Sequence, residues 1–532
     1  MPLVPFVSSR AANEMVASAD AMATQAGLAA LDRGGSAADA AVATNAVLAV
    51  TAPHLCGMGG DLFALVHMDG DAPAALNASG RAGSGADPEA LRDEGHRTMP
   101  MRHEIRTVTV PGCVDGWLAL HARFGRLPLD EVLSPAIAAA ERGTPASPLL
   151  VRSLAAVDAR AGHALRELVE QATVVGARVR RPGIARALRA VAEHGRDGFY
   201  GGAFGHGLLA LAPGYFTEED LDREQADWVE PLTVAAWDQQ LWTIPPNSQG
   251  YLTLAAAALA AGLPLPDDPD DPVWPHLLVE ASRAVGYDRP GFLHERAEAA
   301  DRLEPSHLAG LRQCVSTESM SNRWPAAPIH AGDTTYLCAV DGDRMAVSLI
   351  QSNAAGFGSW LVEPSTGINL HNRGLGFSLE DGHPAEYRPG RRPPHTLSPL
   401  LVTRTDGGLA GVIGTMGGDA QPQILLQLLA RLFGPGRASP PDPAAAIAAG
   451  RWVLHSSSGF DTWSGPPTPS VAVEEHAPAR WSDGLIARGH DVSRWSAYDS
   501  GFGHAHAILA AADDQLVGAA DPRALIGSAA GR

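Results

Sequence analysis

Two neighbouring threonines are the first candidates for chemistry in the sequence. Thr334 and Thr335 follow Gly332-Asp333 and open a stretch, 334–340, that is rich in β-branched and apolar residues. Cleavage between Asp333 and Thr334 would give Thr334 a free α-amine, and a pKa of roughly 7.7–8.0 leaves part of such an amine unprotonated near neutral pH. The amine can then take the proton from its own Oγ and activate it as a nucleophile. The alternative is that two threonines at a strand start reflect β propensity alone.

A glycine pair supplies the second requirement of acyl chemistry. Gly417 and Gly418 follow a predicted strand, Leu409–Met416, and precede a predicted helix, Gln423–Leu432. Glycine lets the backbone approach a ligand closely, and N–H groups in a tight turn stabilise the oxyanion that forms on an attacked carbonyl. The pair is therefore a candidate oxyanion hole for the candidate nucleophile.

Composition excludes several other kinds of catalysis. All forty basic residues are arginine, because the sequence contains no lysine. A Schiff-base lysine, a Ser-Lys dyad and a Walker A loop are therefore ruled out. The sequence has no Gly-x-Ser-x-Gly elbow, no His-Glu-x-x-His and no Cys-x-x-Cys. His504 and His506 form the tightest histidine pair, but acidic and cysteine partners are lacking nearby in the sequence, so we expect no metal and no cofactor.

Charge and hydropathy narrow the range of partners. The net charge of −19 at pH 7 argues against nucleic acid or an anionic membrane surface as the main partner. Apolar stretches such as Leu252–Leu263 are too short to cross a bilayer. The segment Met1–Arg10 lacks a secretory pattern, so we expect a cytoplasmic protein that acts on a small molecule.

The elements that must position these residues follow from local signals. We predict a helix over 20–32, then a second helix that starts at Ser36, with Asp39 as its capping-box partner, and runs to about Val50. The glycine-rich loop 54–61 is interpreted as a tight turn, because a helix precedes it rather than the strand that a phosphate loop requires. A strand over Leu62–Met68 follows. Residues 107–260 look mainly helical, and the strands 334–340 and 345–351 form a hairpin around Asp341-Gly342-Asp343.

A series of motifs resembles the γ-glutamyltranspeptidase family of Ntn hydrolases, in the right order over nearly the whole chain. The motifs are residues 34–43 (GGSAADAAVA), 110–112 (VPG), 197–200 (DGFY), 227–231 (DWVEP), 244–248 (IPPNS), 332–336 (GDTTY), 357–359 (FGS), 414–418 (GTMGG) and 518–523 (GAADPR). The resemblance implies an α/β protein with a four-layer αββα sandwich, made as an inactive precursor. Autocleavage between Asp333 and Thr334 would give a large subunit, 1–333, and a small subunit, 334–532, intertwined in one structural domain.

The same resemblance assigns roles to single residues. It implies that Thr334 is the nucleophile and that Gly417 and Gly418 form the oxyanion hole. Ser352 stands where the family often has a second threonine, whose hydroxyl hydrogen-bonds the nucleophile; judged from the sequence alone, it is a solvated serine at a strand end. The expected assembly is a heterodimer of the two fragments, or a pair of such heterodimers.

The positions that bind substrate in the family are changed in this sequence. Gly376 replaces the aspartate that binds the glutamyl ammonium group, and Arg373 stands where Glu or Gln is usual. Ala354 replaces an asparagine, with Asn353 next to it, and His395-Thr396 replaces a pair of serines. The carboxylate-binding arginine is not aligned, and Arg81 lies nearby but displaced along the chain. These changes favour an anionic acyl group without an α-ammonium group, although a structural ion pair is the alternative role for Arg373.

This pattern is similar to a divergent subgroup of the family that includes an oxamate amidohydrolase and cephalosporin acylases. We therefore expect hydrolysis of an amide whose acyl group carries a carboxylate. One alternative is a true γ-glutamyltransferase that binds its substrate through Asn353 and Asn372. Another is removal of an oxalyl-type group, including C–C cleavage, and the last is an unprocessed homologue without activity.

Overall fold

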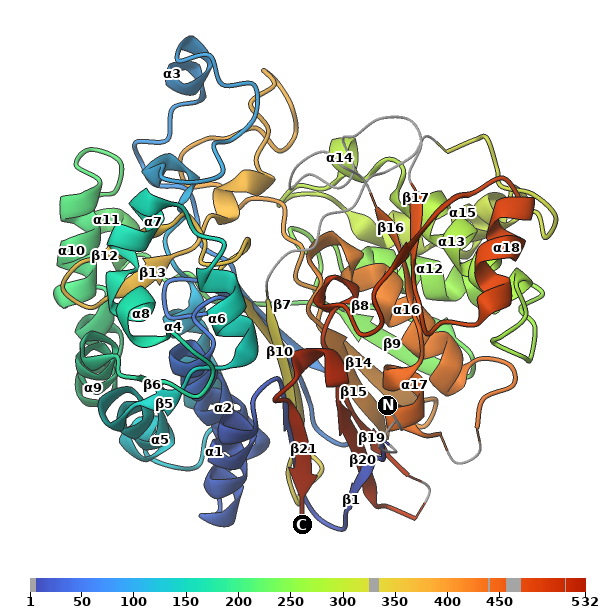
Figure 1. Cartoon of the computed structure of the whole chain (residues 1–532), viewed down its shortest axis with the longest axis horizontal. Coiled ribbons are helices and arrows are strands. Elements are labelled where there is room, and N and C mark those ends of the chain that lie inside the picture. The colour runs from blue at the N-terminus through green and yellow to red at the C-terminus, as the bar shows by residue number, and fades with distance from the viewer. Residues whose placement is uncertain (1–5, 325–333, 439–440, 456–469, 512) are drawn as a thin grey trace.

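Two β-sheets lie face to face at the centre of the molecule, and helices cover the outer face of each (Figure 1). The structure is a computed structural model that describes residues 6–324, 334–438, 441–455, 470–511 and 513–532. The four layers are the αββα sandwich that the sequence motifs imply, so the predicted fold class is confirmed. Apolar side chains fill the space between the two sheets, among them Phe63, Tyr336, Leu401, Val412 and Ile508.

Each sheet has seven strands. The first sheet runs in the order β1 (Ser9–Ala11), β20 (Leu516–Ala520), β19 (Ala505–Ala510), β15 (Leu409–Thr415), β14 (Leu400–Arg404), β9 (Gln239–Thr243) and β8 (Leu232–Ala236). The second runs β21 (Ser528–Gly531), β2 (Met15–Ser18), β10 (Thr335–Val340), β11 (Ala346–Ser352), β3 (Asp61–His67), β4 (Ala74–Ala78) and β7 (Asp227–Val229). Both sheets combine strands from before and after residue 333.

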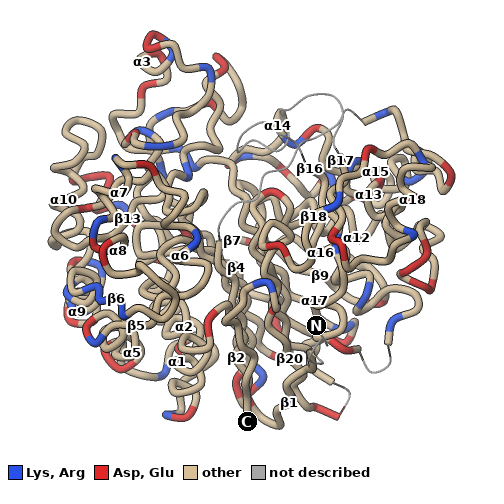
Figure 2. Tube along the Cα trace, in the orientation of Figure 1, with Lys and Arg blue, Asp and Glu red and all other residues tan. Residues whose placement is uncertain are grey.

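The two helical layers come from different parts of the chain. One layer contains α1 (Ala21–Asp32), α2 (Ala37–Thr51), α4 (Cys113–Phe124), α5 (Leu129–Arg142), α9 (Pro182–Phe199) and α10 (Ala203–Leu211). The other contains α12 (Tyr251–Ala261), α13 (Val273–Gly286), α15 (Pro305–Arg312), α16 (Gln421–Phe433), α17 (Pro443–Ala448) and α18 (Ala479–Ala487). Acidic residues (red) and basic residues (blue) are interspersed over both helical layers in Figure 2.

Shorter elements join or flank these layers. The helices are α3 (Pro88–Asp93), α6 (Pro148–Leu154), α7 (Ala159–Ala164), α8 (Arg166–Gln171), α11 (Glu218–Asp222) and α14 (Arg289–Phe292). The strands are β5 (Thr144–Pro145), β6 (Arg178–Val179), β12 (Leu361–Glu363), β13 (Ile368–Leu370), β16 (Trp452–His455), β17 (Ser470–Glu474) and β18 (Asp491–Trp495).

Helix α2 lies at the centre of its layer. All of its residues are buried, as expected for a helix that is apolar on every side. The predicted capping box is confirmed, because the Asp39 N–H donates to Ser36 Oγ (3.2 Å) and the Ser36 N–H donates to Asp39 Oδ2 (2.9 Å). The Ala37 N–H also donates to Asp341 Oδ2 (2.9 Å), so the β10–β11 turn is fixed to the start of this helix.

The glycine-rich loop 54–61 packs against the end of β11. A Cβ on Gly60 would lie 2.3 Å from the Ser352 carbonyl oxygen, and one on Gly59 would lie 2.3 Å from that of Asn369. The side chain of Gln351 exchanges two hydrogen bonds with the Gly57 backbone. The tight-turn interpretation is confirmed, and close packing against two strands explains the glycines.

The expectation of a mainly helical segment over 107–260 is wrong for residues 227–243. This stretch forms β7, β8 and β9 at the edges of the two sheets. The β8–β9 turn places Trp237 and Asp238 at positive φ (51° and 58°), a conformation in which Gly or Asn is usual. The turn therefore lacks the sequence signal that normally identifies a hairpin.

Candidate active site

Thr334 lies immediately before the central strand β10. The antiparallel register pairs Thr335 with Gln351, which brings Thr334 beside Ser352 at the end of β11. Thr334 is 1% exposed, and its Oγ1 donates a hydrogen bond to Ser352 Oγ (3.1 Å). The hairpin predicted from the sequence thus brings the candidate nucleophile into contact with the second hydroxyl. Asp333, the other side of the expected cleavage site, lies outside the described residues.

Arg373 extends this contact into a buried hydrogen-bonded set. Its Nη2 donates to Ser352 Oγ (3.2 Å) and its Nη1 donates to Thr396 Oγ1 (3.1 Å). The Ala354 N–H also donates to Ser352 Oγ (2.8 Å). We call Thr334, Ser352, Arg373 and Thr396 the hydroxyl–guanidinium set. The Arg373 side chain is 1% exposed and donates hydrogen bonds to two hydroxyl groups, so it is not a surface arginine.

Asp61 provides negative charge behind Arg373. It starts β3, and its carboxylate accepts hydrogen bonds from His395 Nε2 (3.1 Å) and the Gly80 N–H (3.0 Å). Burial would raise the pKa of Asp61, but His371, His395 and Arg373 outweigh burial and lower it to about 2. The pKa of Arg373 falls to about 10 through burial, opposed by Asp61 and Asp419, so this side chain remains a cation at neutral pH.

The histidine next to Thr396 is neutral at working pH. Burial, followed by the Arg373 cation, lowers the pKa of His395 to about 3. Its ring packs edge-on against Phe63 and is fully buried. His395 therefore anchors the segment that carries Thr396, whereas Thr396 itself lines a pocket.

The glycine pair lies at the junction of β15 and α16. Gly417 has φ +143° and Gly418 has φ +56°, values that favour glycine. Gly418 starts a short helical turn, where N–H groups lack partners within the helix and can bind an anion. Gln249 Nε2 donates to the carbonyl oxygens of Gly418 (3.2 Å) and Thr396 (3.0 Å). The glycine turn and the Thr396 segment are thus joined by one buried amide.

The two predicted substrate-binding asparagines contact backbone groups. Asn372 accepts from the Ala355 N–H (3.1 Å) and donates to the Met101 carbonyl (2.9 Å). Asn353 Nδ2 donates to the Pro53 carbonyl (3.2 Å). Arg81 pairs with Asp227 (2.9 Å), and Arg392 pairs with the same carboxylate. The side chains of Asn353, Asn372 and Arg81 make these contacts with residues outside the hydroxyl–guanidinium set. Their roles in substrate binding remain predictions.

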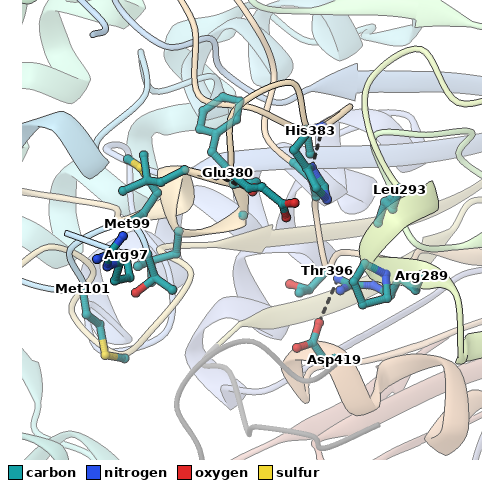
Figure 3. A pocket seen from close by; sticks show the side chains of 18 residues that line it. Arg97, Met99, Met101, Arg289, Leu293, Glu380, His383, Thr396 and Asp419 are labelled. Atoms are coloured by element: carbon teal, nitrogen blue, oxygen red, sulfur yellow. Dashed lines mark hydrogen bonds and ion pairs between the residues drawn. The ribbon is translucent and has the colours of Figure 1, made fainter. Parts of the chain in front are cut away.

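A pocket opens beside Thr396 (Figure 3). Its volume is about 530 Å³, and Asp419 and Arg289 line it together with apolar side chains. Arg289 Nη2 and Asp419 Oδ1 form an ion pair of 3.0 Å. Asp419 directly follows the glycine pair, so the pocket extends from the Thr396 side of the hydroxyl–guanidinium set to the candidate oxyanion hole.

Sequence reasoning did not single out Asp61, Arg289, Asp419 or Gln249. Asp61 and Asp419 each follow a Gly-Gly pair at a junction with a strand or helix, which is a usable signal. Arg289 and Gln249 have no such signal, because their partners lie more than a hundred residues away.

The predicted histidine pair does not gather metal ligands around it. His504 Nε2 contacts Ser500 Oγ (2.9 Å), whereas His506 Nδ1 accepts from the Asp521 N–H (3.2 Å). Over the described ranges of the chain, no group of three or more His, Cys, Asp or Glu side chains is placed to hold a metal ion. None of the helices in those ranges is long and apolar enough to cross a membrane.

Comparisons with known proteins agree with this geometry. The family described as Gamma-glutamyltranspeptidase matches residues 23–531. The chain is 35% identical to the oxamate amidohydrolase proenzyme of Klebsiella pneumoniae, covering 96% of this chain and 97% of that protein. It is 34% identical to the glutathione hydrolase-like YwrD proenzyme of Bacillus subtilis, with 96% and 97% covered. The cephalosporin acylase structure from Bacillus halodurans matches with a TM-score of 0.88 and 32% identity, covering 100% of this chain and 98% of that one.

Proposed function

Because the chain belongs to the γ-glutamyltranspeptidase family, we propose that it is an autoprocessing amidohydrolase with Thr334 as its nucleophile. The observation that carries the proposal is the buried contact between Thr334 Oγ1 and Ser352 Oγ. Ser352 also accepts hydrogen bonds from Arg373 and the Ala354 N–H, so its position next to the nucleophile is fixed. Cleavage before Thr334 gives the α-amine that serves as the base.

The reaction follows from these positions. The α-amine takes the proton from Thr334 Oγ, which attacks the amide carbonyl, and the N–H groups of Gly417 and Gly418 stabilise the oxyanion. The C–N bond then breaks and the amine leaves with the proton. Water attacks the resulting ester, releases the acid and restores Thr334. The two fragments, 1–333 and 334–532, remain together as one enzyme.

The proposed acyl group carries a carboxylate close to the scissile bond. Arg373 supports this choice because it is a buried cation with five N–H donors, and its hydrogen bonds to Thr396 and Ser352 use two of them. A guanidinium binds a carboxylate through paired hydrogen bonds. The name of the Klebsiella relative supports oxamate, or a similar monoamide of a short dicarboxylic acid, as the first substrate to test.

A γ-glutamyl substrate is disfavoured by the same geometry. Its α-ammonium group would lie near the Arg373 cation. It would also have no carboxylate partner at position 376, where this chain has glycine in place of the family's aspartate. Each hydrogen bond to a charged group contributes roughly 1.5–3 kcal/mol, so such a substrate loses much of its binding energy.

The test is the intact mass and the turnover of the purified protein. We expect two fragments under denaturing conditions, the smaller beginning with Thr334, and release of ammonia from oxamate. The Thr334→Ala variant should remain one chain without activity. The Thr334→Ser variant should retain both self-cleavage and turnover, each at a reduced rate. Normal cleavage of Thr334→Ala would refute the nucleophile. Turnover of a γ-glutamyl anilide, but not of oxamate, would refute the acyl group.

A further inference from the structure

The pocket beside Thr396 is larger than the proposed acyl group requires. Its volume of about 530 Å³ is within the range of roughly 300–1,000 Å³ that is typical of sites for drug-sized ligands. Oxamate is an acid amide with only two carbon atoms. Binding of oxamate alone would leave most of this space to water, so the pocket has room for a further part of the substrate.

The walls of this space are largely apolar, and the charges of Arg289 and Asp419 in its lining are paired with each other. Met99 and Met101 lie on one side and Leu293 on the other, as Figure 3 shows. Leu375 and Phe377 also line the pocket. Met99, Leu293 and Phe377 are at most 5% exposed, so these side chains are fixed by packing. Arg97 and Glu380 also line the pocket and are exposed, which places charge at its outer edge. The apolar part of this lining favours an apolar group over a strongly hydrated one.

The position of Arg373 determines which part of the substrate enters this space. Arg373 donates a hydrogen bond to Thr396, which is the member of the hydroxyl–guanidinium set that lines the pocket. In the proposed function, Arg373 binds the carboxylate of a short acyl group and Thr334 attacks its carbonyl carbon, so no part of that acyl group remains to fill the pocket. The nitrogen substituent is then the only part of the amide that can extend into the apolar space.

We propose that the natural substrate is a secondary amide of an oxamate-type acid whose nitrogen carries an aromatic or branched alkyl group. This inference rests on the proposed function and names the leaving amine. Thr334 Oγ bonds to the carbonyl carbon, the C–N bond breaks, and the proton held by the α-amine passes to the departing amine nitrogen. Water then cleaves the ester, so the products are a dicarboxylate and an apolar primary amine.

The experiment compares N-benzyl-oxamate with N-methyl-oxamate, using the processed wild-type enzyme and oxamate as a reference. Both test compounds are secondary amides of alkylamines, and they differ in the apolar group. Since one methylene in an apolar pocket changes kcat/KM by roughly tenfold or more, we expect N-benzyl-oxamate to exceed N-methyl-oxamate by at least about tenfold. Equal values for the two amides, with oxamate hydrolysed, would overturn the inference and leave the proposed function intact. Failure of the processed enzyme on all three compounds would instead refute the proposed acyl group.

Two variants connect the preference to the pocket. Met101→Gln and Leu375→Gln should each reduce the benzyl-to-methyl ratio of kcat/KM several-fold. The matched control is Met68→Gln, because Met68 and Met101 are both 38% exposed and Met68 lies outside the pocket. Self-cleavage of each variant shows that it has folded. An unchanged ratio in both pocket variants would assign the benzyl group to another surface and refute the inference.

Discussion

At the residue scale, the site is built around a cation where the γ-glutamyl enzymes use an anion or amide. Arg373 is held by two hydroxyl groups, and Asp61 and Asp419 supply the opposing charges that favour its ionised form. Asp61 and His395 have pKa values of about 2 and 3, so neither group titrates between pH 5 and 9. In the proposed mechanism, the α-amine of processed Thr334 therefore sets the acid side of the pH profile.

Replacement of Arg373 by methionine should change two kinetic quantities. The KM for oxamate should rise more than tenfold, which corresponds to about 1.4 kcal/mol, because the carboxylate loses its cation. The acid limb of kcat/KM should move to higher pH by about one unit. A neighbouring cation disfavours the ammonium form of Thr334, so removing the cation raises the pKa of that amine.

Steady-state kinetics from pH 5 to 10 would measure both effects. The control is Arg373→Lys, which keeps the positive charge. Its acid limb of kcat/KM should lie close to that of the wild type, whereas its KM for oxamate should stay raised, because lysine lacks the paired donors of arginine. An unchanged KM with an unchanged limb would return Arg373 to a structural role. A second limb near pH 6.5 would show that a histidine titrates during turnover.

At the element scale, the position of Ser352 depends on the glycine-rich loop before β3. A Cβ at residue 60 would lie 2.3 Å from the Ser352 carbonyl oxygen, a distance at which the backbone must move. Gly60→Ala should therefore displace the end of β11, slow self-cleavage at least tenfold and lower the melting temperature by several degrees. Gel analysis of cleavage over time and thermal unfolding would measure these effects.

The matched control for this loop is Gly162→Ala in α7. No atom lies within 4 Å of the Cβ that this substitution adds, and alanine is the better helix former. We expect normal cleavage and equal or higher stability. Equal cleavage rates and melting temperatures for Gly60→Ala and Gly162→Ala would show that self-cleavage tolerates a shift of Ser352.

Local signals predicted the elements that carry the nucleophile. The capping box at Ser36 and Asp39 and the hairpin of β10 and β11 follow from short-range rules, and so does the strand–glycine–helix order around Gly417. The edge strands β8 and β9 were not predictable in this way, because Trp237 and Asp238 occupy the turn in place of glycine.

Contacts between distant segments limited the prediction of the site. Arg373 was identified as a changed position, but its contacts with Ser352 and Thr396 join three segments of the chain that meet only in the tertiary structure. The partners of Asn353 and Asn372 are backbone carbonyls and an N–H group, which carry no residue-specific signal in a sequence. For the same reason, Arg289 could not be connected to Asp419 before the fold was known.

At the scale of the whole molecule, both sheets combine strands from 1–333 and 334–532. In the second sheet, β10 and β11 lie between β2 and β3, so strands of the later segment are bonded on both sides to strands of the earlier one. Separation of the fragments would break these ladders and expose the apolar layer between the sheets. Cleavage should therefore leave the assembly intact.

Mass measurements under two conditions test this expectation. The processed protein should have the same native mass as the uncleaved Thr334→Ala chain, and should separate into two fragments only in denaturant. The same native measurement shows whether one or two such assemblies associate. Dissociation of the fragments in native buffer would contradict the expectation that the shared sheets hold them together.

Thr334 is buried at the start of a strand that has neighbours on both sides. If the proposed chain end at Thr334 were made before folding, it would have to be inserted between the two neighbouring strands β2 and β11. The proposed cleavage would therefore follow both synthesis and folding, and the new terminus would form last. Under this proposal a newly made chain has no activity until it has folded, so folding itself would control when hydrolysis begins.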